Sequence, residues 1–157
     1  MARDNFSTCL DFTLKWEGSG YTDDPRDPGG ATKWGVTLNT LAHWRGKPTT
    51  KSDVMGLTRE EASAIYRNHY WDTINADALA RGVDLMGFDI AVNMGAGRSL
   101  GWLAECKNMR PFEQIEYLDG KRRSFWRSLK TWAVYGKGWS RREDACVSFA
   151  NVMLRSK

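Results

Sequence analysis

One stretch of the chain interrupts an otherwise helical pattern of apolar residues. Residues 15–37 read KWEGSGYTDDPRDPGGATKWGVT. Within this stretch, residues 18–36 are rich in Gly, Pro, Asp and Thr, and they include two Asp-Pro steps and a Gly-Gly pair. These residues favour turns over continuous helix. We therefore expect an irregular loop or a small β-hairpin directly after the first helix.

Helical spacing of apolar residues dominates on both sides of this stretch. The spacing predicts helices over residues 6–16, 38–44, 58–71, 83–96, 99–106, 111–132 and 141–154. Thr58 and Glu61 are spaced for a capping box, in which each side chain accepts a hydrogen bond from the backbone of the other residue. The glycines at 95 and 97, and those at 136 and 138, are expected to mark bends between helices. The prediction is a mainly α single domain with a small loop or β-hairpin segment.

Composition is typical of a soluble globular protein. The 157 residues are 41% hydrophobic and 27% charged, and a chain of this length can bury a core without disulfides or metals. Cys9, Cys106 and Cys146 are too far apart in the sequence to suggest a disulfide framework or a zinc site, so we expect small core residues. Residues 83–96 are too short to span a bilayer and should form a buried helix.

Positive charge is concentrated near the C-terminal end. Residues 121–142 contain eight Lys or Arg and no Asp or Glu, with Trp126, Trp132, Tyr135 and Trp139 interleaved. Such a basic aromatic block suits a polyanionic partner that presents flat or sugar surfaces, and nucleic acid, anionic membrane and bacterial cell wall all qualify. The alternative is a solvated helix face whose tryptophans pack inward.

The residue types that carry chemistry gather where the first helix meets the loop. Helical spacing places Glu17 on the stripe formed by Phe6, Leu10 and Leu14. An ionised carboxylate loses solvation in apolar surroundings, so such a Glu should have a raised pKa and be able to act as a general acid. The alternative is a solvent-facing carboxylate at the helix C-terminus, where the helix dipole disfavours an anion.

Asp24, Asp27 and Thr32 follow closely enough for the chain to fold back and present them opposite Glu17. Glycoside hydrolysis uses two carboxyl groups that face a shared gap. One protonates the leaving oxygen, and the other activates water or stabilises positive charge on the sugar ring. The alternative is that each Asp only forms a turn before its proline.

These residues closely resemble a known signature. Residues 15–37 are similar to the motif of glycoside hydrolase family 108, which consists of phage and prophage N-acetylmuramidases. That motif reads Glu-Gly-Gly-Tyr, two Asp-Pro steps, Gly-Gly-Ala-Thr and Gly-Ile-Thr. Residues 88–95, FDIAVNMG, resemble the central helix of the family, and residues 122–139 resemble its C-terminal region, described as a predicted peptidoglycan-binding part.

The resemblance implies a lysozyme-like fold and hydrolysis of the β-1,4 bond from N-acetylmuramic acid to N-acetylglucosamine. It gives Glu17 the catalytic role. The order Glu17, Asp27, Thr32 also resembles the Glu, Asp, Thr triad of phage lysozymes, in which Asp and Thr position the attacking water. This chain carries one inserted residue between Glu17 and Tyr21, which leaves Asp24 open as the assisting residue instead of Asp27.

Further residues are candidates for substrate binding. Asp24 and the rings of Tyr21 and Trp34 could contact sugars, although aromatics at such spacings are also common in protein cores. Asp89 and Asn93 lie one helical turn apart and could hydrogen-bond N-acetyl groups. The alternative for these two is a satisfied buried pair that supports the loop.

The expected organisation is one muramidase domain over residues 1–157. Residues 1–96 would form its catalytic part, and residues 97–157 a C-terminal helical part able to bind peptidoglycan. We expect a monomer that needs no cofactor or metal, binds no nucleic acid, and meets an anionic envelope surface through residues 121–142. Residues 1–5 lead into a mixed pattern without the apolar core of a secretory signal. We therefore expect the host bacterial cytoplasm as its location until a holin gives access to the periplasm.

Two other functions remain open. A lytic transglycosylase would use Glu17 as both acid and base and would leave 1,6-anhydro sugar ends, without needing a second carboxylate. A non-catalytic cell-wall-binding module would rely on the basic aromatic block and would survive the loss of Glu17.

Overall fold

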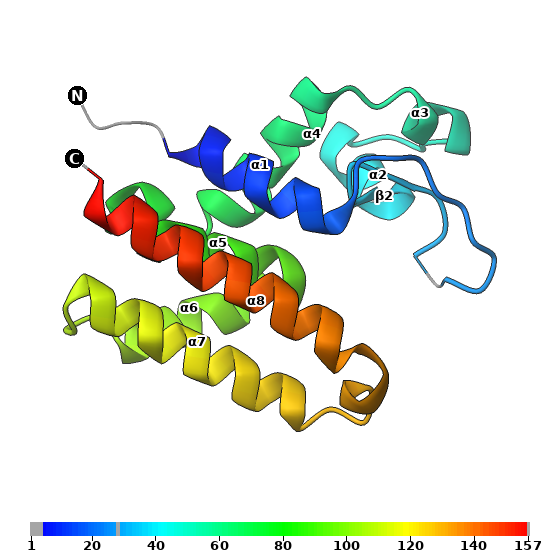
Figure 1. Ribbon diagram of the computed structural model, residues 1–157. Helices are drawn as coiled ribbons and strands as arrows, with labels where there is room; N and C mark the ends of the chain where they lie inside the picture. Colours follow the sequence, from blue (N-terminus) through cyan, green and yellow to red (C-terminus); the bar gives the residue numbers. More distant parts are fainter. Residues whose placement is uncertain (1–4, 28, 157) are drawn as a thin grey trace. The chain divides into compact units, whose positions relative to one another are not determined.

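The computed structural model describes residues 5–27 and 29–156 (Figure 1). The chain forms two compact units. Residues 10–68 make up the first, called here the hairpin unit, and residues 5–9 together with 69–156 make up the second, called the helical unit. Pro28, which completes the second Asp-Pro step, lies outside the described residues. The expected functional division at residues 96 and 97 stays a prediction, and it falls inside the helical unit.

The hairpin unit contains helices around one small β-hairpin. Its elements are most of α1 (Phe6–Glu17), then β1 (Thr32–Lys33), β2 (Val36–Thr37), α2 (Leu38–Arg45), α3 (Lys51–Met55) and α4 (Arg59–Tyr66). Strand β1 pairs antiparallel with β2, with Lys33 opposite Val36. The two residues between them, Trp34 and Gly35, have φ angles of 53° and 72°. Two consecutive positive φ angles are the signature of a type I′ turn, so the hairpin expected after the first helix is present.

Two local expectations in this unit need correction. Helix α3 was not predicted, although Thr50 and Asp53 form the complete capping box that starts it. Thr58 accepts from the backbone N–H of Glu61 as expected. The Glu61 carboxylate, however, takes two hydrogen bonds from Arg45, at 2.7 and 3.0 Å. A charged partner is the stronger donor and draws Glu61 away from the cap.

The helical unit is built around α5. Its elements are the π-helical turn η1 (Arg67–Trp71), which begins in the hairpin unit, then η2 (Ala76–Ala78), α5 (Val83–Met94), α6 (Ala96–Glu105), α7 (Pro111–Arg127) and α8 (Trp132–Arg155). Helices α6, α7 and α8 all contact α5 (Figure 1). Residues 83–91 of α5 are all buried, which confirms the predicted buried helix. None of the helices within residues 5–27 and 29–156 combines the length and the hydropathy that a membrane span requires.

Aromatic rings pack together in the core of the helical unit. Phe6, in the first turn of α1, meets Trp71 and Phe88 edge-on, with ring centroids 5.4 and 5.8 Å apart. Such edge-to-face contacts are favourable beyond the area they bury. The three cysteines are buried core residues, as the sequence predicted, and the described part of the chain contains no disulfide. The mainly α fold with its small hairpin is confirmed.

The expected boundaries of the last two helices are wrong. Helix α7 ends at Arg127, and α8 begins at Trp132 and continues through Gly136 and Gly138, where a bend was expected. Gly136 is needed inside the helix because the Trp132 ring lies against it: a β-carbon at position 136 would come within 2.8 Å of that ring. The expected bend at Gly95 is confirmed, since its φ of 99° separates α5 from α6.

Substituting the two glycines of α8 tests this explanation. Position 138 is open, because no atom lies within 4 Å of the point that a β-carbon would occupy, so Gly138→Ala should raise the free energy of unfolding by about 0.5–1 kcal/mol. Gly136→Ala should lower it, because the clash with Trp132 outweighs the same gain in helix propensity. Urea unfolding of both variants measures the difference. Equal stabilisation by the two alanines would contradict the proposed role of Gly136.

Candidate active site

Glu17 is the last residue of α1 and is exposed. Gly18, with a φ of 91°, ends the helix, and its N–H donates to the carbonyl of Leu14 at 2.9 Å. The apolar stripe is buried up to Leu14, which is 6% exposed, but the final turn of the helix extends beyond it. The expected burial of Glu17 among apolar residues is therefore wrong, and its carboxyl group is accessible to a ligand.

The β-hairpin turn lies beside Glu17. A β-carbon at Gly35 would be 3.7 Å from that of Glu17 and only 2.3 Å from the hydroxyl of Tyr66. Only glycine leaves the turn room between these side chains. The turn thus sits against the base of the proposed catalytic residue.

Two hydrogen bonds fix the turn to the rest of the hairpin unit. The Tyr66 hydroxyl donates to the carbonyl of Trp34 at 2.7 Å, and the Trp34 indole donates to the carbonyl of Leu57 at 3.2 Å. A left-handed backbone costs a non-glycine residue about 1–2 kcal/mol. These bonds hold Trp34 in that conformation. Tyr66 was not singled out from the sequence, because its role depends on a residue 32 positions away.

Asp24 and Asp27 both form turns in the loop after α1. Asp24 accepts two hydrogen bonds from the Arg26 guanidinium, at 3.1 and 2.9 Å, and one from the Arg26 N–H at 2.9 Å. These bonds hold the pKa of the Asp24 carboxyl below its usual value. Asp27 is exposed and accepts one hydrogen bond from the N–H of Gly29 at 2.8 Å. Both residues therefore form turns, as the alternative interpretation expected. Of the two carboxylates, that of Asp24 is the one paired with the charged side chain of Arg26.

Thr32 lies in β1 and pairs with Thr22. Their backbones exchange two hydrogen bonds, at 2.9 and 2.8 Å, and their hydroxyl oxygens lie 2.6 Å apart. One hydroxyl donates to the other, so the pair retains one hydroxyl proton for another acceptor. Thr22 was missed because its relation to Thr32 comes from strand pairing that the Gly and Pro pattern does not specify.

The aromatic candidates of the loop are half-buried. The hydroxyl of Tyr21 is buried and has no hydrogen-bond partner among the described residues. Asp23, close to it in the sequence, pairs with Lys51 at 2.8 Å and raises the pKa of that lysine. The ring of Trp34 remains partly exposed while its N–H is engaged. Sugar contact by Tyr21 and Trp34 stays a prediction.

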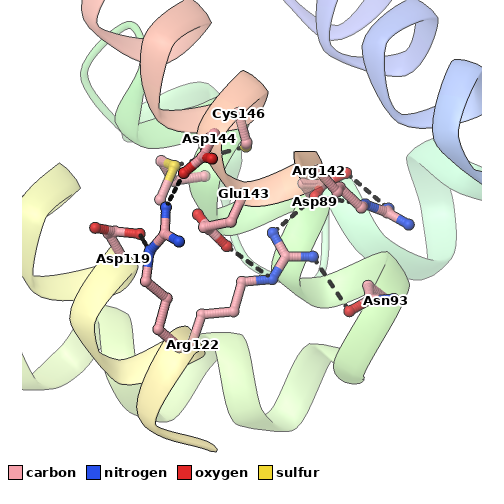
Figure 2. Close-up of polar contacts among 10 residues, drawn as sticks. Asp89, Asn93, Asp119, Arg122, Arg142, Glu143, Asp144 and Cys146 are labelled. Carbon is pink, nitrogen blue, oxygen red and sulfur yellow. Dashed lines mark hydrogen bonds and ion pairs between the residues drawn. The ribbon is translucent and has the colours of Figure 1, made fainter. Parts of the chain in front are cut away.

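Asp89 is fully buried in the helical unit and is held by two arginines (Figure 2). Its oxygens accept from Arg122 at 2.7 Å and from Arg142 at 2.8 and 3.1 Å. Burial alone would raise the pKa of Asp89, but the charges and hydrogen bonds of Arg122 and Arg142 outweigh it and hold the pKa at about 2. Asp89 is therefore a buried residue with satisfied hydrogen bonds, which was the alternative to direct contact with a sugar. These two arginines lie on α7 and α8.

Arg122 connects Asp89 to two further side chains (Figure 2). It donates to the amide oxygen of Asn93 at 3.2 Å. Its Nε lies 3.2 Å from a Glu143 oxygen, but without the alignment of a hydrogen bond, so neither oxygen of Glu143 has such a bond among the described residues. Burial raises the pKa of Glu143 to about 7. Asn93 is only half-buried, and its contact with a sugar stays a prediction.

The comparisons with known proteins agree with the motif. A family model described as glycosyl hydrolase 108 matches residues 10–95. The chain belongs to the glycosyl hydrolase 108 family. A solved structure titled "Structure of Brucella abortus SagA" is similar at 32% sequence identity, with a TM-score of 0.86 over 98% of this chain and 97% of that chain. No curated protein sequence matches.

Family membership supports a glycoside hydrolase whose substrate is peptidoglycan, and the fold is mainly α and lysozyme-like. The family match covers Glu17 and the whole hairpin. In residues 5–27 and 29–156, no group of three or more His, Cys, Asp or Glu side chains is arranged to hold a metal ion.

Activity should depend on the absence of a side chain at position 35. Gly35→Ala should lower the rate of peptidoglycan cleavage about 10- to 100-fold, because moving the turn displaces the neighbouring Glu17. Gly30→Ala is the matched control: Gly30 also has a positive φ, 65°, but nothing lies within 4 Å of its place for a β-carbon. Added to Gly35→Ala, Tyr66→Phe removes both the clashing oxygen and its hydrogen bond to the Trp34 carbonyl, so it should restore only part of the activity. Equal rates for the two alanine variants would exclude this positioning role.

Stability should respond to the protonation of Glu143. Its pKa is about 7 in the folded protein against an ordinary value of 4.5, so the unfolded chain loses this proton first. The free energy of unfolding should therefore fall as the pH rises from about 4.5 to about 7. Glu143→Gln removes this contribution. The difference between the free energies of unfolding of the two proteins, measured across this pH range, cancels the contributions of the other carboxyl groups. Parallel pH dependences in the two proteins would contradict this prediction, because they would show that folding does not raise the pKa of Glu143.

Proposed function

We propose that the chain is an endolysin of the phage muramidase type, which hydrolyses the β-1,4 bond between N-acetylmuramic acid and N-acetylglucosamine. Glu17 is its general acid. The observation that carries the proposal is the position of Glu17: it is exposed at the end of α1 and lies against a type I′ turn, within the motif of a glycoside hydrolase family.

The first chemical step is proton transfer from Glu17 to the glycosidic oxygen. The bond from that oxygen to the anomeric carbon breaks, and positive charge develops on the sugar ring. A water oxygen then bonds to the anomeric carbon and gives its proton to a carboxylate. The products are a new reducing end and a free hydroxyl group on the leaving sugar.

Asp27 and Thr32 orient this water or stabilise the charge on the ring. Exposure of Asp27 supports its role, whereas the carboxylate of Asp24 is occupied by Arg26. The hydroxyl proton left by the pairing of Thr32 with Thr22 can hold the water or a sugar oxygen. Asp24 then acts as the residue that shapes the loop.

The remaining candidates contribute to substrate binding. Tyr21 and Trp34 offer rings to the sugars, and Asn93 offers its amide. Asp89 is a positioning residue, because it fixes Arg122, which in turn holds Asn93.

The basic aromatic block is proposed to hold the enzyme on the anionic envelope. Arg122, Arg142 and Trp126 of this block are buried. The exposed cations that remain are Arg127, Lys130, Lys137 and Arg141. Action as a monomer and holin-assisted access to the wall stay predictions.

Loss of the Glu17 carboxyl tests the proposal. Glu17→Gln should reduce the lysis of outer-membrane-permeabilised Gram-negative cells about 100- to 10,000-fold, because the amide cannot supply the proton. Turbidity measures lysis, and circular dichroism verifies folding. Glu60→Gln is the matched control, since Glu60 is an exposed carboxyl of the same unit. A folded Glu17→Gln protein that lyses cells like the wild type would overturn the assignment.

A further inference from the structure

A pocket of about 330 Å³ opens in the helical unit at the C-terminal end of α5. This volume is at the lower end of the range of small-ligand sites. The residues that line it include Asn93, Met94, Arg98, Phe125, Trp126 and Trp139. They come from four helices, α5 to α8, so the packing of this unit builds the pocket.

Aromatic rings form one wall. Trp126 and Trp139 stack with ring centroids 5.5 Å apart and an interplanar angle of 20°. Trp126 is 3% exposed, and the Arg122 guanidinium lies over its ring at 4.5 Å. Trp139 is only half-buried. Tyr135 and Trp132 also contact this ring, with centroids 5.8 and 6.2 Å away, so its neighbours keep it in place. The part of the ring that they leave exposed can contact the apolar face of a sugar.

Asn93 supplies a hydrogen-bond donor of fixed orientation. A guanidinium only donates hydrogen bonds, so the atom of Asn93 that meets Arg122 is its oxygen (Figure 2). The amide nitrogen is left to donate. Because Arg122 is itself held by Asp89 and is 0% exposed, this donor is set in advance for an acceptor such as the carbonyl oxygen of an acetamido group.

Arg98 supplies a positive charge at the same pocket. Its guanidinium lies 3.7 Å above the centre of the Phe125 ring. Stacking occupies the flat face of the guanidinium and leaves its N–H edges available for a planar anion. In the part of the chain that the structure describes, no carboxylate forms an ion pair with Arg98. By contrast, Arg122, Arg123 and Arg142 of the same unit all have carboxylate partners.

We propose that this pocket is a saccharide subsite selective for an acetamido sugar that carries a carboxylate. The sugar ring packs on Trp139, Asn93 donates to the acetamido carbonyl, and Arg98 binds the carboxylate. Such a ligand has the chemistry of N-acetylmuramic acid, whose lactyl ether distinguishes it from N-acetylglucosamine. The identity of the ligand rests on the proposed muramidase function.

These two sugars provide a matched pair of probes for the intact protein. Titration is followed through the indole N–H signals in NMR spectra, with the Trp139 signal assigned by substitution to Phe. N-acetylmuramic acid should shift the Trp139 signal and bind about tenfold more tightly than N-acetylglucosamine, because only the acid forms a charge-assisted hydrogen bond with Arg98.

Substitution of Arg98 separates the charge from the rest of the pocket. Arg98→Ala should remove the preference for N-acetylmuramic acid and leave binding of N-acetylglucosamine unchanged. Arg155→Ala, which removes an exposed cation at the end of α8 outside this pocket, should keep the preference. Equal affinity of the wild type for the two sugars, or an unmoved Trp139 signal, would overturn the proposal.

The two measurements distinguish a failure of the subsite from a failure of the catalytic assignment. If the intact protein cleaves peptidoglycan but shows no preference for N-acetylmuramic acid, only the subsite fails. If it shows the preference but cleaves no glycan, the subsite stands and the proposed muramidase activity fails.

Discussion

Arg122 is a fully buried cation, and the packing of the helical unit depends on how its charge is compensated. It pairs with Asp89 on α5 and lies next to Glu143 on α8, while Arg142 supplies a second cation to Asp89. A buried charge is tolerated only with a partner in good geometry, and removal of one partner commonly costs about 3–5 kcal/mol. Helices α5, α7 and α8 must therefore meet in a register that brings these side chains together. The same register fixes the amide of Asn93.

In the hairpin unit, the exposed carboxyl group of Glu17 is placed by a different kind of constraint. Its constraint is conformational instead of electrostatic: Trp34 and Gly35 adopt positive φ angles, and hydrogen bonds from Tyr66 and to the carbonyl of Leu57 secure the turn. Glu17 stands against this turn at the end of its helix. An exposed carboxyl group next to a fixed turn suits the proton donation proposed for Glu17, because a large polymeric substrate must be able to reach it.

The sequence predicted those features that depend on local pattern. Apolar periodicity located most helices, and the Gly, Pro and Asp run located the hairpin. Features that depend on distant partners were not predictable. Asp89 is bound by residues 33 and 53 positions away, so its burial could be suspected, but its partners could not be identified. Gly136 was predicted to form a bend because its contact with the Trp132 ring cannot be inferred from the sequence. The exposure of Glu17 depends on where the core ends, and apolar periodicity does not give that position.

Hydrolysis by this chain can be tested most directly on purified peptidoglycan digested by the intact protein in ¹⁸O-labelled water. Mass spectrometry of the released fragments then reports the origin of the oxygen at each new end. Muramidase action predicts reducing N-acetylmuramic acid ends that carry one ¹⁸O, because the anomeric carbon bonds to a water oxygen. Fragments with 1,6-anhydro ends and no label would contradict hydrolysis and identify a lytic transglycosylase. Intact glycan would contradict catalysis altogether.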